Sequence, residues 1–202
     1  MNAEERKEAL RKVKDSILTL KDSFLADERI RNNVFPVIGE GSHFASIMVI
    51  GEAPGKNEAA TGRPFCGASG RILDELLLSV GLKREDIYIT NIVKDRPPEN
   101  RDPTPQEIEA YGPFLDTQID IIQPKVIATL GRFAMDYIMR KFGLEFEILP
   151  ISQAHGKVWE AETSYGKVTI IPLYHPAASI YNQHLKDTLR EDFKVMKQYS
   201  NK

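Results

Sequence analysis

The sequence predicts an α/β protein, a three-layer α/β/α sandwich around a central four-stranded parallel sheet. Four short apolar segments rich in β-branched residues predict the strands, and helical patterns separate them. Strands that alternate with helices imply parallel pairing with right-handed crossovers. A length of 202 residues, 42% of them hydrophobic, suffices for one domain with a full core. We therefore expect a single domain over residues 1–202.

The N-terminal segment is the first expected element. Over residues 4–25, apolar residues recur at three- and four-residue steps from Leu10 to Phe24, which is the stripe of an amphipathic helix. We expect residues 1–30 to cover the domain with this helix. The apolar run 47–51 predicts the first strand, and the pattern 70–80 predicts a helix after a long loop.

The second half of the expected sheet follows the same alternation. Residues 86–93, 126–131 and 168–173 predict strands, and 104–122, 132–142 and 185–199 predict helices. Thr104, Pro105 and Glu107 supply an N-cap, a proline at the first helical position and a capping box. The glycine- and proline-marked segment 143–167, with a turn at 164–167, predicts an irregular excursion or a small hairpin around residues 157–159.

Composition excludes several classes of protein. The net charge of −2 and a pI near 6.1 argue against binding nucleic acid through bulk positive charge, so any DNA contact must be local. One cysteine, Cys66, leaves no disulfide framework and no cysteine cluster for a metal. We find neither a membrane span nor a secretory signal in the sequence. These features predict a cytoplasmic protein, expected to be a monomer, without a metal or another cofactor.

The expected strands all run into polar segments marked by glycine or proline. These segments are residues 51–55, 90–98, 130–132 and 174–178. Ligands of open parallel sheets bind beyond the carboxyl ends of the strands. The sequence therefore predicts a site where these four loops meet.

The first loop, residues 51–70, has the sequence GEAPGKNEAATGRPFCGASG. Its glycines let backbone amides approach a ligand, and Ser69 and Gly70 at a helix start offer N–H groups to a phosphate. The loop matches neither a Walker motif nor the dinucleotide-binding fingerprint. The alternative interpretation is a long ordered turn with structural glycines.

Two side chains in these loops suit a nucleobase. Phe65 offers an aromatic face for an unstacked base, although a lone phenylalanine more often plugs the core. Asn91 ends the second strand, where its amide offers a donor and an acceptor to one edge of a base. Asparagine at a strand end is equally common as a turn former.

Histidines and basic residues complete the candidate site. His175 follows the fourth strand, where an imidazole could donate to a developing anion, and His155 is a candidate phosphate contact. The spacing of the histidines and acidic residues matches no metal-ligand motif. Basic residues near strand ends predict a local positive rim for phosphates, with a solvated, salt-bridged surface as the alternative. They are Arg63, Arg71, Lys94, Arg96, Arg101 and Arg132.

Taken together, these loops resemble the uracil-DNA glycosylase superfamily, and its family 4 most closely. The resemblance covers about residues 35–195 and rests on four motifs in the family's order. They are the first loop at 51–70, YITNIVKDRPPENRDPTPQE at 88–107, PKVIATLGRFA at 124–134 and YHPA at 174–177.

The resemblance implies roles for individual residues. Phe65 stacks on uracil, Asn91 reads its polar edge, and the backbone at Glu52, Ala53 and Pro54 completes the pocket. His175 donates to uracil O2 as negative charge builds. Ala53 stands where a related family has a water-activating aspartate, which leaves Glu52 and Glu58 as acidic candidates, with Glu52 favoured. The loop after His175 resembles one that enters the minor groove, with Ile180 or Tyr181 as the wedge.

One departure from family 4 is large. The resemblance implies a four-iron four-sulfur cluster on four cysteines, but two of those positions read Asp95 and Tyr111, and the N-terminal region has no cysteine. We therefore expect no cluster. We expect packing of Phe24, Phe35 and Tyr111, with ion pairs from Asp95, to hold this region.

The leading interpretation is a monofunctional glycosylase that flips uracil out of single- or double-stranded DNA and hydrolyses its N-glycosidic bond, leaving an abasic site. One alternative is a broader glycosylase that also removes hypoxanthine or xanthine. Another is a catalytically weak protein that only binds uracil-containing DNA.

Overall fold

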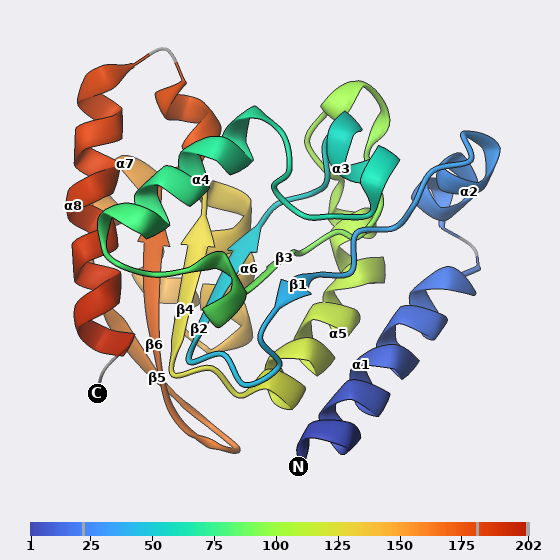
Figure 1. The fold of residues 1–202 in the computed structure, drawn as a ribbon, viewed down its shortest axis with the longest axis horizontal. Helices are drawn as coiled ribbons and strands as arrows, with labels where there is room; N and C mark the ends of the chain where they lie inside the picture. Colours follow the sequence, from blue (N-terminus) through green and yellow to red (C-terminus); the bar gives the residue numbers. More distant parts are fainter. Residues whose placement is uncertain (22, 181, 201–202) are drawn as a thin grey trace.

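A six-stranded mixed sheet runs through the centre of the molecule (Figure 1). The structure is a computed structural model, and it describes residues 1–21, 23–180 and 182–200. The strand order is β1-β3-β2-β4-β6-β5. The four inner strands pair in parallel, while β1 and β5 pair antiparallel at the two edges. The strands are β1 (Glu40–Gly41), β2 (Ile47–Gly51), β3 (Tyr88–Asn91), β4 (Val126–Leu130), β5 (Trp159–Thr163) and β6 (Gly166–Leu173).

The predicted α/β class is confirmed, but the predicted number of strands was wrong. The additional strands are both edge strands with weak sequence signals. β1 has two residues, and in β5 only Ala161 is buried, so neither shows an apolar pattern. The hairpin predicted in this segment is formed by β5 and β6, and its turn at residues 164–165 falls within the predicted turn at 164–167. Its first strand begins at Trp159, at the end of the predicted 157–159.

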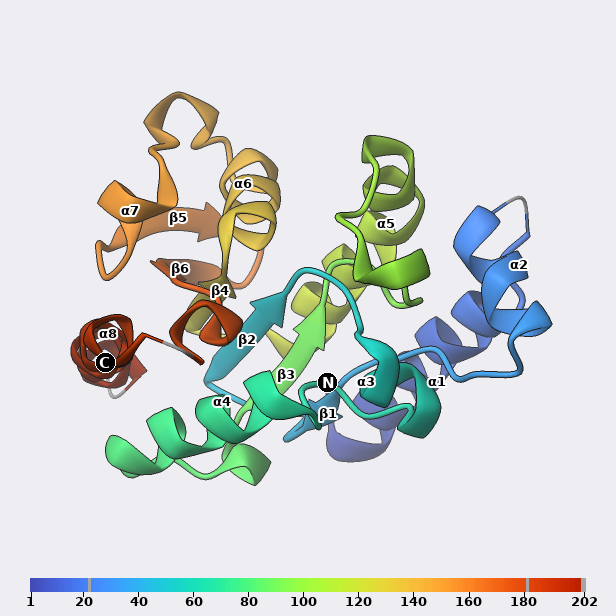
Figure 2. The ribbon, with the colours of Figure 1, turned by 90° about the horizontal axis from the view of Figure 1, so that it is seen from above.

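Helices cover both faces of the sheet (Figure 2). α4 and α8 pack on one face, and α5 and α6 pack on the other, with α1 against α5. The helices are α1 (Ala3–Leu18), α2 (Phe24–Arg31), α3 (Lys56–Thr61), α4 (Ala68–Ser79), α5 (Pro105–Ile122), α6 (Arg132–Lys141), α7 (Ile151–Ala154) and α8 (Gln183–Ser200). Short 3₁₀ helices are η1 (Arg84–Asp86), η2 (Pro98–Asn100), η3 (Glu145–Glu147) and η4 (Pro176–Ser179). None of the described helices has both the length and the apolar character needed to cross a bilayer.

The N-terminal cover consists of two helices rather than the single helix predicted over residues 4–25. α1 buries Leu10, Val13 and Ile17 as the stripe predicts. It ends at Leu18, and Ser23 then caps a new helix by accepting a hydrogen bond from the Ala26 amide. The new start turns the chain, so Phe24 leaves the stripe and is 52% exposed.

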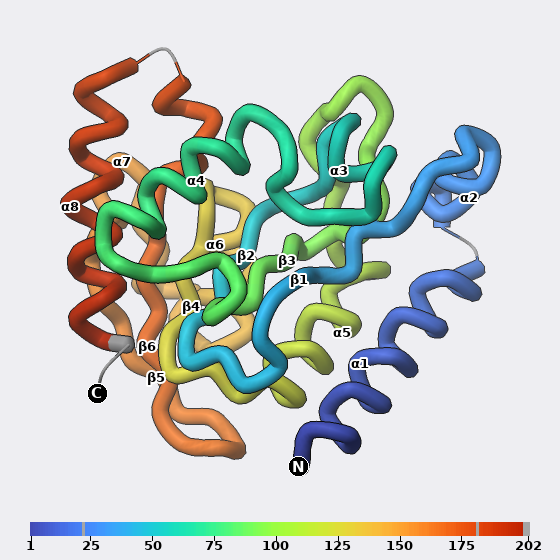
Figure 3. Tube along the Cα trace, in the orientation of Figure 1, coloured from blue at the N-terminus to red at the C-terminus, as the bar shows by residue number. Residues whose placement is uncertain are grey.

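The strand ends bring three of the four predicted loops together, whereas residues 130–132 after β4 supply none of the residues that line the site. The capping box of Thr104 and Glu107 forms as predicted and starts α5 after the loop that follows β3. In Figure 3 the segments that follow β2, β3 and β6 rise at the same end of the sheet. The site therefore lies where the carboxyl ends of parallel strands meet.

Candidate active site

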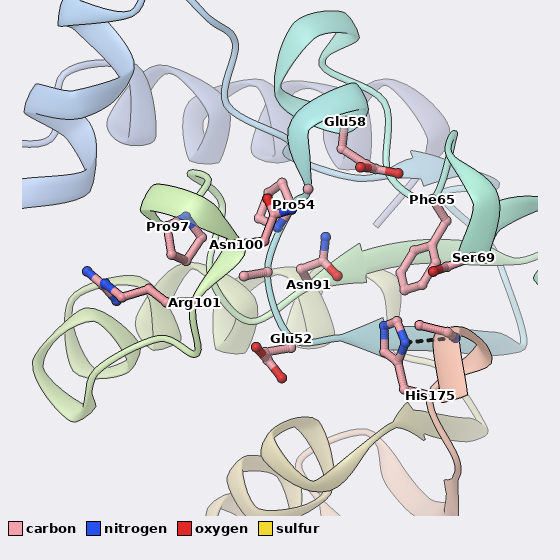
Figure 4. Close-up of a pocket in the computed structure, with 13 residues that line it drawn as sticks. Glu52, Pro54, Glu58, Phe65, Ser69, Asn91, Pro97, Asn100, Arg101 and His175 are labelled. Carbon is pink, nitrogen blue, oxygen red and sulfur yellow. Dashed lines mark hydrogen bonds between the residues drawn. The ribbon is translucent and has the colours of Figure 1, made fainter. Parts of the chain in front are cut away.

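A pocket of about 340 Å³ opens at the carboxyl ends of β2, β3 and β6 (Figure 4). The structure brings together nine of the residues predicted for the site: Glu52, Ala53, Pro54, Glu58, Phe65, Ser69, Asn91, Arg101 and His175. The remaining lining residues are Gly55, Pro97, Asn100 and Ala177. A cavity of this volume suits a small planar ring rather than a large ligand.

Phe65 and Asn91 meet at the last residue of β2. Gly51 pairs with Asn91 in the sheet, and a Cβ at Gly51 would overlap both Asn91 Oδ1 and the Phe65 ring. Glycine is therefore needed here for space. Asn91 is 1% exposed, and its Oδ1 has no hydrogen-bond partner within the described residues. A buried, unpartnered oxygen at a pocket wall is an acceptor available to a ligand.

Glu58 holds the first loop in shape. Its Oε1 accepts hydrogen bonds from the backbone amides of Cys66 and Gly67, both at 3.0 Å. Charge-assisted bonds to two successive amides fix the chain directly after Phe65. Glu58 lines the pocket, but one of its oxygens is already engaged by the loop.

His175 is held as one neutral tautomer. Its Nδ1 accepts a hydrogen bond from the Ala177 amide at 3.1 Å, so the ring proton lies on Nε2. Burial lowers the pKa of His175 to about 4, and the opposing influence of the Glu58 carboxylate is smaller. At neutral pH the ring therefore presents one neutral N–H donor. The ring centroid lies 5.8 Å from that of Phe65.

Glu52 has an environment unlike that of Glu58. Burial and, to a smaller extent, the Asp102 carboxylate raise the pKa of Glu52 to about 7, against the opposing influence of the Arg132 guanidinium. Arg132 itself pairs with Asp102 at 2.6 Å. A carboxyl group that titrates near neutral pH can take up or release a proton under working conditions.

Lys94 does not belong to the positive rim, and its predicted DNA contact was wrong. It is fully buried, and its Nζ donates to Thr90 Oγ1 at 2.8 Å, Asn91 O at 2.6 Å and Gln118 Oε1 at 2.6 Å. Burial lowers the pKa of Lys94. The side chain fixes the backbone at Asn91 from inside the protein and cannot reach a phosphate.

Other predicted DNA contacts lie around the pocket or away from it. Arg101 lines the pocket and makes a two-pronged ion pair with Glu107, with N–O distances of 2.8 and 2.6 Å. Arg96 donates to Asn100 Oδ1 at 2.7 Å. Arg132 is exposed beside the site, and Ile180 is exposed at the end of η4. Tyr181 lies outside the described residues.

His155 lies outside the pocket lining. Its Nδ1 bonds Asp192 Oδ2 at 2.9 Å, and its ring lies 4.5 Å, centroid to centroid, from Tyr174. His155, in the segment before β5, is thus linked to α8 through Asp192 and to Tyr174, the residue before His175.

The residues at the cysteine positions do not fit an iron–sulfur cluster. Asp95 Oδ2 accepts hydrogen bonds from Arg29 Nη1 at 2.8 Å and from the Tyr111 hydroxyl at 2.6 Å, and Ser23 Oγ lies 3.3 Å from that hydroxyl. All four side chains are buried. Their oxygen and nitrogen atoms bond one another, and Cys66 lies in the first loop. Cluster iron requires thiolates at such positions.

The predicted packing of this region was partly wrong. The ion pair of Asp95 and the burial of Tyr111 are confirmed, but Phe24 and Phe35 are 52% and 59% exposed. The aromatic rings expected to fill the space are on the surface because Arg29, whose guanidinium also donates to Ile17 O and Leu18 O, occupies the interior instead.

Asn100 lines the pocket although it was not among the predicted site residues. Asn100 and Glu99 have positive φ angles of 54°, which turn the chain after Pro98 toward the site. Asparagine tolerates this left-handed conformation, so the residues Glu99 and Asn100 after two prolines carried a usable turn signal.

The sequence is similar to known proteins over most of its length. The family model described as the uracil DNA glycosylase superfamily matches residues 38–197. The chain is 48% identical to the type-4 uracil-DNA glycosylase of Archaeoglobus fulgidus, over 82% of this chain and 81% of that protein. It is 43% identical to the Sulfurisphaera tokodaii type-4 enzyme, over 95% and 84% of the two chains. It is 40% identical to that of Thermotoga maritima, over 85% of each.

Proposed function

The chain belongs to the uracil DNA glycosylase superfamily, and from this premise we propose that it is a uracil-DNA glycosylase of DNA repair. It flips uracil out of DNA, hydrolyses the N-glycosidic bond and leaves an abasic site. The observation that carries this proposal is the meeting of Phe65, Asn91 and His175 around one small pocket. The three offer an aromatic face, an amide and a neutral N–H donor.

Asn91 supplies the discrimination between bases. Its amide offers an acceptor to uracil N3–H and a donor to uracil O4. Cytosine presents the opposite pattern, an unprotonated N3 and an amino group at C4, so it would face like groups. A buried site built to hydrogen-bond one pattern rejects the other strongly, because its polar atoms are left unpaired. Phe65 stacks on the ring, and the backbone of residues 52–54 completes the pocket.

His175 and Glu52 divide the chemistry. As the bond between C1′ and N1 breaks, its electron pair moves onto uracil, and His175 Nε2–H donates to O2 as charge builds there. Water then adds to C1′ of the oxocarbenium-like sugar. Glu52, as a carboxylate, holds this water and accepts its proton. Glu58 keeps the loop in shape through its bonds to Cys66 and Gly67.

The proposal is tested by excision assays on labelled oligonucleotides that carry uracil, hypoxanthine, xanthine or thymine, single- and double-stranded. We expect alkali-sensitive breaks at uracil, with and without a chelator. Cleavage of hypoxanthine or xanthine at similar rates would favour the broader glycosylase. Binding without breaks above those of a His175→Ala, Glu52→Ala double variant would reduce the chain to a DNA-binding protein.

Glu52→Gln is expected to slow excision by about 10²-fold, the usual range for loss of a general base. In the unmodified protein the rate should rise with pH through about 7, where Glu52 ionises. The variant should lose this rise. Single-turnover rates between pH 5 and 9 measure both effects, and a variant that keeps the rise would assign it to another group.

Glu52→Gln, which slows excision, is not expected to destabilise the folded protein above pH 7. Because the pKa of Glu52 is raised from 4.5 to about 7, the folded protein binds more protons than the unfolded chain between these values. The contribution of the Glu52 carboxyl to the free energy of unfolding is fully present below pH 4.5 and is lost as pH rises through 7. Urea unfolding at pH 8 should therefore show Glu52→Gln to be at least as stable as the unmodified protein.

The DNA-binding surface that we propose comprises Ser69, Arg96, Arg101 and Arg132, with Ile180 as the wedge. Its test is the slope of log Kd against log salt concentration, for uracil-containing DNA. Arg132→Ala should reduce that slope by about 1, because one phosphate contact is lost. Lys94→Met serves as the matched control and should leave the slope unchanged, since Lys94 is buried. A change in slope with Lys94→Met would contradict this surface.

The contacts of His155 and Tyr181 with DNA, the monomeric state and the cytoplasmic location stay predictions from the sequence. We propose them together with the glycosylase function.

A further inference from the structure

A single arginine holds the backbone on which the Phe65 ring is mounted. Arg84, in η1, donates from Nη1 to Phe65 O at 3.2 Å and from Nη2 to Pro64 O. Asp74 Oδ1 lies 3.0 Å from Nη1, and Glu40 Oε1 lies 3.5 Å from Nε. Two carboxylates thus hold a guanidinium against two successive carbonyls. Arg84 is outside the pocket lining and touches none of the groups assigned to the chemistry.

The backbone at Phe65 needs such support. Its φ of 48° lies in the left-handed region, which is strained for a bulky residue and persists only where neighbouring groups fix it. Arg84 binds the carbonyls of Pro64 and Phe65, and Glu58 binds the amides of Cys66 and Gly67. A cation therefore meets the carbonyl side of this turn, and an anion meets its amide side.

A glycine shapes the remaining side of the turn. A Cβ at Gly70 would overlap Phe65 O, so the start of α4 approaches this carbonyl more closely than any other residue type allows. With Gly51 beneath the ring, the position of Phe65 is set by contacts from β2, α3, α4 and η1. Among these contacts, only Arg84 supplies hydrogen bonds to the Phe65 carbonyl within the described residues.

We propose that Arg84 is a positioning residue for base binding, which acts by holding Phe65 in its left-handed conformation. The proposal rests on the proposed function, because it takes Phe65 to stack on the extruded uracil. Without Arg84, two carbonyls lose their charged donors, and Phe65 can relax to an ordinary φ that moves its ring from the pocket. We therefore expect weaker binding of the base, with little change in the rate of the bond-breaking step that His175 assists.

The test is a double-mutant cycle between Arg84→Ala and Phe65→Leu, measured as single-turnover excision of uracil at increasing enzyme concentration. Arg84→Ala alone should raise the half-saturating concentration by about 10-fold, as for loss of a charged hydrogen bond, and change the maximal rate by less than about 3-fold. In the Phe65→Leu background it should change half-saturation by less than about 2-fold, because the ring that it positions is gone.

Lys83→Ala is the matched control. Lys83 directly precedes Arg84, but its side chain is 74% exposed, faces Glu85 at 3.8 Å and lies outside the pocket lining. It should shift half-saturation by less than about 3-fold. Arg84→Lys should restore part of the binding, since an ammonium can still donate to one carbonyl. If thermal unfolding shows that the Arg84→Ala variant is not folded, Arg84→Lys replaces it in the double-mutant cycle.

The outcomes separate the two proposals. Equal losses from the Arg84 substitution in both backgrounds, or no loss in either, would overturn the positioning role while uracil release by the unmodified protein stands. If the unmodified protein releases no uracil, the proposed function itself fails. A loss confined to the background that retains Phe65 supports both proposals.

Discussion

His175→Ala is expected to lower the maximal rate of uracil excision by about 10²–10³-fold, the range for loss of one donor to a developing oxyanion. The Ala177 amide donates to Nδ1 and thereby fixes the tautomer of His175. The ring proton is therefore already on Nε2 before substrate binds. A donor held in place in this way needs no reorganisation as charge appears on uracil O2. The half-saturating enzyme concentration should change little, since Phe65 and Asn91 still bind the base.

The pH dependence separates His175 from Glu52. Because the pKa of His175 is lowered to about 4, the ring stays neutral between pH 6 and 9, and the pH dependence near 7 should persist in His175→Ala. His184→Ala, at an exposed histidine of α8, is the control and should keep full activity. If His175→Ala removed the rise in rate near pH 7, the roles assigned to the two residues would have to be exchanged.

Asp95→Ala is expected to lower the free energy of unfolding by about 3–5 kcal/mol, because it leaves the buried Arg29 guanidinium without its carboxylate. Arg29 is 5% exposed and Asp95 is 1% exposed, so water cannot replace the lost partner. The Tyr111 hydroxyl also loses its acceptor. For a chain of this length the melting temperature should fall by about 6–20 °C. Urea and thermal unfolding measure the change.

A double substitution tests the cause of this loss. Arg29→Met with Asp95→Leu removes both charges and should destabilise the protein less than Asp95→Ala alone, since no charge is left buried and unpaired. Tyr111→Phe should cost about 1–3 kcal/mol through the loss of one hydrogen bond to a charged group. Equal losses for the single and double variants would show that packing, rather than charge pairing, holds this region.

The sequence predicted the fold well where periodicity was strong. The inner strands are short apolar runs, and the capping residues of α5 are local signals that read the same in sequence and structure. β1 and β5 lack such signals. β1 has only two residues and β5 only one buried residue, so each is recognised as a strand only through its pairing with the neighbouring strand. The break between α1 and α2 was missed because the apolar stripe continues through Phe24 although the chain turns at Ser23.

The sequence predicted most of the residues that line the candidate site, but fewer of those that hold these residues in place. Loops at strand ends identify Phe65, Asn91 and His175, since the carboxyl edge of a parallel sheet gathers them. Whether a lysine near such an edge points outward depends on its neighbours, and Lys94 turns inward to three acceptors supplied by β3 and α5. Arg84 precedes β3 by several residues, so no local pattern relates it to Phe65. Such long-range partners emerge only from the folded chain.

The polar network of Ser23, Arg29, Asp95 and Tyr111 has a consequence for the conditions under which the protein folds. It joins α2 to α5 and to the loop after β3 through nitrogen and oxygen atoms alone. Neither the supply of iron nor the oxidation of sulfur acts on such a junction. We therefore expect the chain to fold in an oxidising, iron-free medium as readily as in a reducing one, with equal yields on refolding under the two conditions.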